Sequence, residues 1–236
     1  NYYNMKNSRF YIITAIAIIS MLSLSSCLSI DRKIKINADG SGTEVQTFNI
    51  DRTFYDLIYS MVKAMDSTRA MSVKDSLYKH DELLIPIRAN LSSKEGIELI
   101  SLTGVTNEDS SATYKFEYKF NEVSKIGYAT NISAKDISGE KENKSEIVWN
   151  DNGNTINFSL LYKPDPGEDI NQEENNKAFS FLFANKNVNF EIEFPYEIQS
   201  SNAINSTGNK GVWTFPVSEL MLDKTKKLYI EAVLKK

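Results

Sequence analysis

Apolar and polar residues alternate in short stretches along much of this 236-residue chain, and a period of two is typical of β-strands with one buried and one solvent-facing side. The clearest stretch runs from Thr113 to Phe120, where four aromatic residues share one face and three charged residues share the other. Another runs from Ile30 to Asn37 and is followed by the turn residues Asp39 and Gly40. A returning stretch, Thr43 to Ile50, completes a predicted β-hairpin.

Further alternating stretches continue this pattern toward the C-terminus. The other predicted strands are Ile97 to Val105, Ile147 to Trp149, Thr155 to Lys163, Val188 to Phe194, Val212 to Phe215 and Lys227 to Leu234. A turn is predicted over Pro195 to Gly211. No stretch has the strand, helix, strand pattern of a parallel βαβ unit, so we expect an antiparallel sheet.

A helical block interrupts the hairpins after the first of them. Asp51 to about Met65 is predicted to be a helix, capped by its first residue and carrying an apolar stripe at helical spacing. Ser72 to Asp75 resembles a capping box that would begin a second helix. Pro86 is expected to interrupt that helix, leaving Ile87 to Lys94 as a separate short helix closed by Gly96. The predicted fold class is α+β: an antiparallel sheet of hairpins with an inserted helical block after the first hairpin.

The N-terminal residues have the features of an export signal. Lys6 and Arg9 precede an uncharged apolar run from Phe10 to Leu24, which is shorter than a membrane-spanning helix and fits a signal peptide. The run ends in Leu24-Ser25-Ser26-Cys27, which resembles the lipobox of bacterial lipoproteins, in which the cysteine is acylated before cleavage. Cys27 is therefore the predicted site of lipidation.

The predicted domain organisation follows from this cleavage site. Residues 1–26 are a lipoprotein signal peptide, with Met5 as the natural start of translation and residues 1–4 upstream of it. Residues 27–236 are expected to form a single envelope domain. The acidic stretch 164–176, which is poor in apolar residues, is its candidate hinge loop.

The residues after Cys27 suggest where the domain lies. Leu28 stands where enterobacterial lipoproteins retained in the inner membrane carry Asp, so the periplasmic face of the outer membrane is the expected location in a bacterium with two membranes. The first predicted strand begins only three residues after the cysteine, which holds the domain close to the lipid headgroups. Two or three acyl chains at about 0.8 kcal/mol per buried methylene would make this attachment stable.

Charge and the rare residue types exclude several classes of function. A formal net charge of −4 at pH 7 does not suit binding to nucleic acid. The single histidine, His80, lies among charged residues on a predicted helix face exposed to solvent, and the single cysteine, Cys27, is consumed by lipidation. We therefore expect a non-enzymatic protein with no catalytic residue, no metal site and no cofactor.

The aromatic strand face allows two interpretations. Such a face usually packs into the core of a domain, but a curved sheet with an aromatic face beneath helices also encloses apolar ligands. Close to a membrane, such a ligand would be a lipid. The candidate ligand-binding residues are Tyr114, Phe116, Tyr118 and Phe120.

Three stretches together resemble the LppM-like family of bacterial lipoproteins. They are IKINADGSGTEVQTFNI, GIELISLTGVTNEDSSATYKFEYKF and FPYEIQSSNAINSTGNKGVWTF, the last with Asn202 after a strand and Trp213 in the next strand. The resemblance implies a membrane-anchored envelope domain of mixed α/β fold that handles lipid or glycolipid without catalysis.

Two functions remain open from the sequence. The first is a membrane-anchored envelope lipoprotein that binds a lipid-like or apolar ligand close to the membrane. The alternative is an envelope scaffold or assembly protein that binds another protein through its surface. An accessible volume beside the aromatic face would favour the first, and a filled core with an exposed apolar patch would favour the second.

Overall fold

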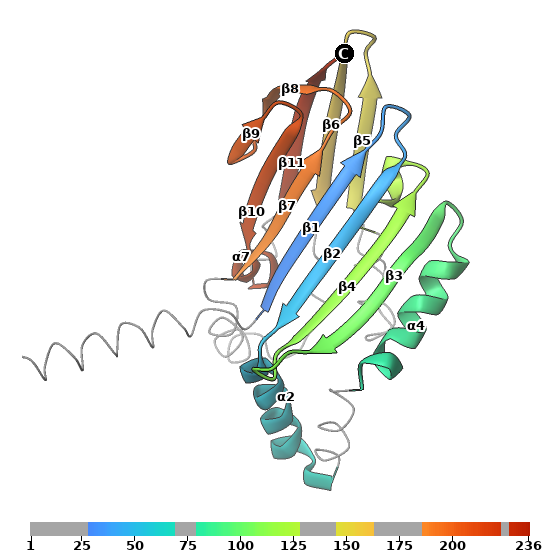
Figure 1. Cartoon of the computed structure of the whole chain (residues 1–236). Helices are drawn as coiled ribbons and strands as arrows, with labels where there is room; N and C mark the ends of the chain where they lie inside the picture. Colours follow the sequence, from blue (N-terminus) through green and yellow to red (C-terminus); the bar gives the residue numbers. More distant parts are fainter. Residues whose placement is uncertain (1–27, 69–78, 128–144, 163–185, 223–226) are drawn as a thin grey trace, which may run out of the picture.

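The computed structural model describes residues 28–68, 79–127, 145–162, 186–222 and 227–236, and this part of the chain forms two β-sheets and a few short helices (Figure 1). The larger sheet has seven strands in the order β3-β4-β2-β1-β7-β10-β9, and the smaller has four in the order β5-β6-β11-β8. The strands are β1 Leu28–Ile36, β2 Gly42–Ile50, β3 Ile97–Thr106, β4 Ala112–Phe120, β5 Ser145–Asp151, β6 Thr155–Tyr162, β7 Asn187–Glu193, β8 Glu197–Ser201, β9 Asn205–Thr207, β10 Lys210–Pro216 and β11 Leu228–Lys235.

The predicted hairpins are confirmed, and two of them close with the same turn. Between β1 and β2, Asp39 accepts hydrogen bonds from the N–H and Oγ of Ser41 at 3.0 and 2.6 Å, and Gly40 takes a φ of 82°. Between β3 and β4, Asp109 accepts the same two bonds from Ser111 at 2.9 and 2.6 Å. Short polar side chains that satisfy the backbone locally therefore close both hairpins.

One strand pairing departs from the antiparallel expectation. β1 lies in the middle of the seven-stranded sheet, antiparallel to β2 on one side and parallel to β7 on the other, with Ile30 opposite Val188. The prediction of a single sheet without a parallel pair was therefore wrong. The reason is that β1 and β7 are far apart in sequence, so no local strand, helix, strand pattern marks their pairing.

The two sheets pack through their inner faces. The Phe158 ring of the smaller sheet meets Phe194 edge-on at 5.2 Å between centroids, and Phe194 meets Trp213 of the larger sheet at 6.5 Å. At the other side of the larger sheet, helix α4 packs along β3 and buries Leu84 and Leu91 in the same core. The inner face of the seven-stranded sheet is thus covered by the smaller sheet near β7 and β10 and by helix α4 near β3.

The first predicted helix is confirmed. Helix α2 spans Arg52–Met65, and the side chain of its N-cap residue, Asp51, accepts a hydrogen bond from the backbone N–H of Thr53 at 2.7 Å. An Asp at this position satisfies one of the free backbone donors of the first helical turn. The cap therefore fixes where the chain leaves β2 and enters the helix.

The predicted break at Pro86 was wrong. Helix α4 runs without interruption over His80–Ser93, so it passes through Pro86 and includes the separate helix expected at Ile87 to Lys94. A proline removes one backbone hydrogen bond within a helix, and the burial of Leu84 and Leu91 against the sheet offsets that loss.

The region after β7 contains elements that the sequence did not indicate. Strands β8 and β9 lie within Pro195 to Gly211, where only a turn was predicted, and helix α7 follows β10 over Val217–Leu222. β8 joins the smaller sheet and β9 the larger one, so the chain changes sheets between Ser201 and Asn205. The exposed, polar composition of these short strands hides their period of two.

The described part of the chain is mostly β, with a few short helices, and is mainly antiparallel. The helical block does follow the first hairpin, but it is small beside two sheets, so the α+β class overstates it. Several predictions lie outside the described residues: the signal peptide with Cys27, the capping box at 72–75, the hinge loop at 164–176 and a helix at 177–185. Within the described ranges, no helix combines the length and apolar character needed to span a membrane.

Candidate functional site

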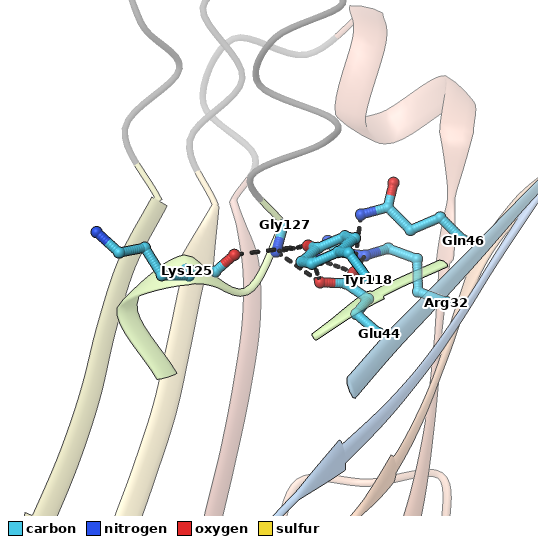
Figure 2. Close-up of polar contacts among 6 residues, drawn as sticks. All are labelled: Arg32, Glu44, Gln46, Tyr118, Lys125 and Gly127. Atoms are coloured by element: carbon cyan, nitrogen blue, oxygen red, sulfur yellow. Dashed lines mark hydrogen bonds and ion pairs between the residues drawn. The ribbon is translucent and has the colours of Figure 1, made fainter. Parts of the chain in front are cut away.

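A cluster of buried polar side chains lies on the inner face of the seven-stranded sheet (Figure 2). Arg32 comes from β1, Glu44 and Gln46 from β2, and Tyr118 from β4. These four residues and the backbone of Gly127 are called the Glu44 cluster below. Arg32 lies opposite Gln46 in the strand register, and Glu44 lies opposite Tyr118, so the sheet itself brings the four side chains together.

Glu44 is the centre of this cluster because both of its carboxylate oxygens accept hydrogen bonds. Oε1 accepts from Arg32 Nε at 2.7 Å and from Gln46 Nε2 at 2.8 Å. Oε2 accepts from the backbone N–H of Gly127 at 2.8 Å and from the hydroxyl of Tyr118. The carboxylate therefore joins three neighbouring strands to the segment that follows β4.

The burial of this ion pair sets its electrostatics. The side chains of Arg32 and Glu44 are 8% and 0% exposed, and the Arg32 guanidinium also lies over the ring of Phe190 at 4.7 Å. Burial, followed by the negative charge of Glu44, raises the pKa of the Tyr118 hydroxyl well above its ordinary value, so this hydroxyl stays protonated as a donor. A carboxylate with two donors on each oxygen suits a structural cross-link better than proton transfer.

Gly127 is required at its position for two reasons. It has a φ of 79°, and a Cβ atom there would lie 2.8 Å from Nη2 of Arg32. We expect Gly127→Ala to lower the free energy of unfolding by about 2 to 3 kcal/mol, because the left-handed backbone costs about 1 kcal/mol and Arg32 must move from Glu44. Urea denaturation followed by tryptophan fluorescence measures this loss.

Gly153 provides the matched control for that substitution. Its φ is 86°, and a Cβ atom there would have no neighbour within 4 Å. Gly153→Ala should therefore lose only the backbone contribution of about 1 kcal/mol. Equal losses in the two variants would show that the contact with Arg32 contributes nothing.

Sequence reasoning missed this cluster, although a signal was present. Arg32 is in phase with Ile30, Ile34 and Ile36, so the period of two places a charged residue on the buried face. Glu44 in the next strand likewise alternates on the inward-facing side. A cation and a carboxylate at inward positions of adjacent strands indicate a buried ion pair.

The four predicted ligand-binding residues all face the core from β4. Tyr114, Phe116, Tyr118 and Phe120 are 7%, 5%, 0% and 3% exposed, but each contacts different partners. Tyr118 belongs to the Glu44 cluster, and Phe116 meets the ring of Phe48 at 5.2 Å. The four side chains thus share a face, and their role in ligand binding stays a prediction.

Tyr114 anchors the start of helix α4 through the single histidine. The Nδ1 atom of His80 lies 2.9 Å from the Tyr114 hydroxyl, and its Nε2 atom lies 2.7 Å from Oγ1 of Thr106. The hydroxyl of Tyr55 in α2 lies 3.4 Å from that of Tyr114. Burial raises the pKa of Tyr114. His80 was expected on a solvated helix face and is instead half-buried, because α4 begins directly against β3 and β4.

Phe120 lines a hollow of about 560 Å³ at the end of the sheet that carries the β1–β2 turn. The hollow is also lined by Asn37, Ser41, Gly42, Thr43, Gly96, Ile97, Glu98, Lys119 and Asn121. Its lining includes residues with amide, hydroxyl and charged side chains, whereas Phe120 itself is 3% exposed and faces the core. Such a lining resembles sites for amphipathic ligands more than a purely apolar cavity.

Asn202 joins the two sheets through three hydrogen bonds. Its Oδ1 atom accepts from Trp213 Nε1 at 2.7 Å and from the backbone N–H of Glu231 at 2.9 Å. Its Nδ2 atom donates to the carbonyl oxygen of Tyr229 at 2.9 Å. The sequence indicated Asn202 only as a turn residue and Trp213 only as core, so this bridge is a finding of the structure.

Comparisons with solved structures give a likeness in fold. No protein-family model and no curated protein matches the sequence. The NMR structure of the folded domain of LppM from Mycobacterium tuberculosis is similar, with a TM-score of 0.47 and 10% sequence identity over 89% of this chain and 90% of that one. LppM has the same name as the family that the sequence resembles. The values describe a likeness in the path of the chain and do not extend to ligands or membrane attachment.

Proposed function

We propose that this chain is a lipid-anchored, non-enzymatic protein of the bacterial cell envelope, on the periplasmic face of the outer membrane, that binds a lipid-like or apolar ligand. The observation that carries the proposal is the lipobox at Leu24 to Cys27 followed at once by folded structure, since β1 begins at Leu28. The chain has no spacer between the proposed lipidated residue and the domain, which is the arrangement expected of a protein that works next to the membrane surface.

The position of β1 decides which end of the domain would face the membrane. Leu28 pairs with Ile50 at one end of the seven-stranded sheet, and Ile36 pairs with Gly42 at the other. β1 has nine residues, so the β1–β2 turn lies about 30 Å from the anchor. Helix α2 follows β2 at the anchored end (Figure 1).

Cys27→Ser is expected to release the protein from the membrane and to leave the precursor uncleaved by the lipoprotein signal peptidase, because serine lacks the thiol that is acylated. Fractionation of bacterial cells expressing the full chain, followed by intact-mass measurement, tests both results. A wild-type mass increased by at least one diacylglyceryl group is the positive control. Unchanged membrane association of the variant would contradict the lipid anchor and favour an uncleaved signal anchor.

The ligand in this proposal is a lipid or glycolipid. Support comes from the inward aromatic face of β4 and from the hollow at the β1–β2 turn, whose lining includes residues with hydroxyl, amide and charged side chains. An amphipathic molecule with sugar or headgroup oxygens matches that combination. The hollow lies near the β1–β2 turn, about 30 Å from the proposed anchor, so a ligand held there would lie farther from the membrane than the sequence led us to expect.

A protein-binding scaffold is the second candidate. The observation that favours it is a set of large apolar side chains exposed at the side of the sheet formed by β3 and α4. Ile100 and Val105 of β3 are 45% and 51% exposed, and Ile85 of α4 is 63% exposed. Exposed aliphatic residues near a sheet edge are typical of protein interaction sites.

Native mass spectrometry of the full chain, purified from bacterial membranes in mild detergent, separates the two candidates. We expect a co-purified lipid or glycolipid at about one per chain, identified by organic extraction and lost when Thr43, a half-buried residue that lines the hollow, is replaced by Trp. Thr47→Trp is the control, since Thr47 lies on the same face of β2 and is not part of the lining. A protein that carries only its own acyl chains, together with a stoichiometric protein partner, would support the scaffold.

A further inference from the structure

Helix α2 is held at the same end of the domain as the proposed lipid anchor. Leu28, next to Cys27 in sequence, pairs with Ile50, and α2 begins at Arg52. The paired strand position and two peptide links place Leu28 within about 12 Å of the first helical turn. Figure 1 shows α2 projecting beyond the end of the seven-stranded sheet at which β1 begins.

The first half of α2 is fixed to the sheet. Tyr55 is 4% exposed, and its hydroxyl lies 3.4 Å from that of Tyr114 in β4. Phe54 and Leu57 pack against the edge of the core. Together with the cap at Asp51, these contacts set the direction in which the rest of the helix leaves the sheet.

The helix is strongly amphipathic along its whole length. Val62 continues the face that begins with Phe54 and Leu57, and it is half-buried. The opposite face carries exposed polar residues, among them Asp56 and Ser60. Tyr59 lies at the boundary between the two faces, where an aromatic ring with a polar tip suits a membrane interface.

We propose that the second half of the apolar face of α2, which includes Val62 and lies beyond the residues packed on the core, contacts the interfacial region of the bilayer and serves as a second membrane contact beside the acyl chains. This proposal rests on the lipid anchor proposed above, because the anchor is what brings this end of the domain to the membrane. An amphipathic helix with balanced charge binds membranes weakly by itself, and tethering by a lipid raises its effective concentration at the surface. The two contacts together would hold the domain in one orientation.

A depth measurement on the full lipidated chain tests this contact. Cys27 is the single cysteine, and its sulfur is a thioether after acylation, so a cysteine introduced elsewhere is the one free thiol. A nitroxide label is attached to Val62→Cys, and the protein is reconstituted into vesicles of phosphatidylethanolamine and phosphatidylglycerol. Ser60→Cys, on the polar face of α2, and Ala38→Cys, in the exposed β1–β2 turn, are the matched controls.

We expect the label at Val62 to show a ratio of oxygen to nickel-complex accessibility several-fold higher than the labels at Ser60 and Ala38. Equal ratios at the three sites would overturn the contact, as would low accessibility to both reagents at Val62, which would indicate packing against protein. Flotation of the vesicles separates the two proposals. If the protein floats with the vesicles but the label at Val62 has the same accessibility ratio as the controls, only the helix contact is contradicted. If the protein does not float, the lipid anchor is contradicted as well.

Discussion

Glu44→Gln is expected to lower the free energy of unfolding by about 3 to 5 kcal/mol, because it leaves a buried arginine without a counter-charge. Arg32 is 8% exposed on its side chain and has Glu44 as its ion-pair partner. The amide of glutamine keeps the shape of the side chain but replaces one acceptor oxygen with a donor. That donor would face either the hydroxyl of Tyr118 or the guanidinium and amide of Arg32 and Gln46. Urea denaturation at neutral pH measures the loss.

Glu98→Gln is the matched control because it removes the same charge from the same sheet at an exposed position. Glu98 pairs with Lys119 at 2.9 Å, and their side chains are 67% and 53% exposed. An ion pair of this kind contributes about 0.5 kcal/mol or less. If both variants lost a similar small amount, the buried pair would not stabilise the fold beyond its surface counterpart.

Asn202→Ala is expected to lower the free energy of unfolding by about 1 to 2 kcal/mol, because of the three groups that it leaves unpaired only the indole N–H of Trp213 is buried. The substitution leaves the indole N–H of the buried Trp213 and the backbone N–H of Glu231 without their acceptor, and the carbonyl of Tyr229 without a donor. Each buried polar group left unpaired costs about 1 to 3 kcal/mol, and water can reach part of this site. The measurement is urea denaturation followed by the fluorescence of Trp213 and Trp149.

Two further variants make the Asn202 result specific. Asn205→Ala changes the same residue type at an exposed position in β9 and should be nearly neutral. Asn202→Asp keeps an acceptor for Trp213 but loses the donor to Tyr229. Its decrease in the free energy of unfolding should therefore lie between those of Asn205→Ala and Asn202→Ala. If Asn205→Ala lowered the free energy of unfolding as much as Asn202→Ala, the β8–β9 region, and not the hydrogen bonds of Asn202 between the sheets, would limit stability.

The sequence predicted the local elements of this fold well. Alternation of apolar residues marked the hairpin of β1 and β2 and the strand that ends at Phe120, and the spacing after Asp51 marked α2. Each of these signals depends only on neighbours in the chain. Turn and cap residues such as Asp39 act within two or three positions of themselves, which is why they can be recognised without a structure.

The missed features depend on residues far apart in the chain. The parallel pairing of β1 with β7, the change of sheet between β8 and β9 and the continuous helix through Pro86 are all decided by tertiary packing. The candidate site falls between these cases. The inward phase of Arg32 and Glu44 was visible in the sequence, but the N–H of Gly127 that completes their hydrogen bonds was not.

The aromatic face of β4 shows which features of a site a residue pattern can predict and which it cannot. The inward direction of Tyr114, Phe116, Tyr118 and Phe120 followed from their spacing and is confirmed by their burial. Their hydrogen-bond partners could not be predicted from that spacing. Tyr118 bonds to the carboxylate of Glu44 on β2, and Tyr114 to His80 on α4. Spacing within one strand specifies a face, whereas the chemistry on that face is decided by what the neighbouring elements bring to it.

The central place of β1 has a consequence for how this protein reaches its folded state. On the proposed export route the chain crosses the membrane from its N-terminus, so β1 and β2 emerge first and can form their hairpin at once. The other neighbour of β1 arrives much later, since Asn189 of β7 bonds to Asp31 across 158 residues of sequence. Until then β1 presents an unpaired edge, which favours association with other chains. We therefore expect folding to be slow and limited by closure of this long loop, and we expect chaperones that cover the unpaired edge of β1 to raise the yield of folded protein.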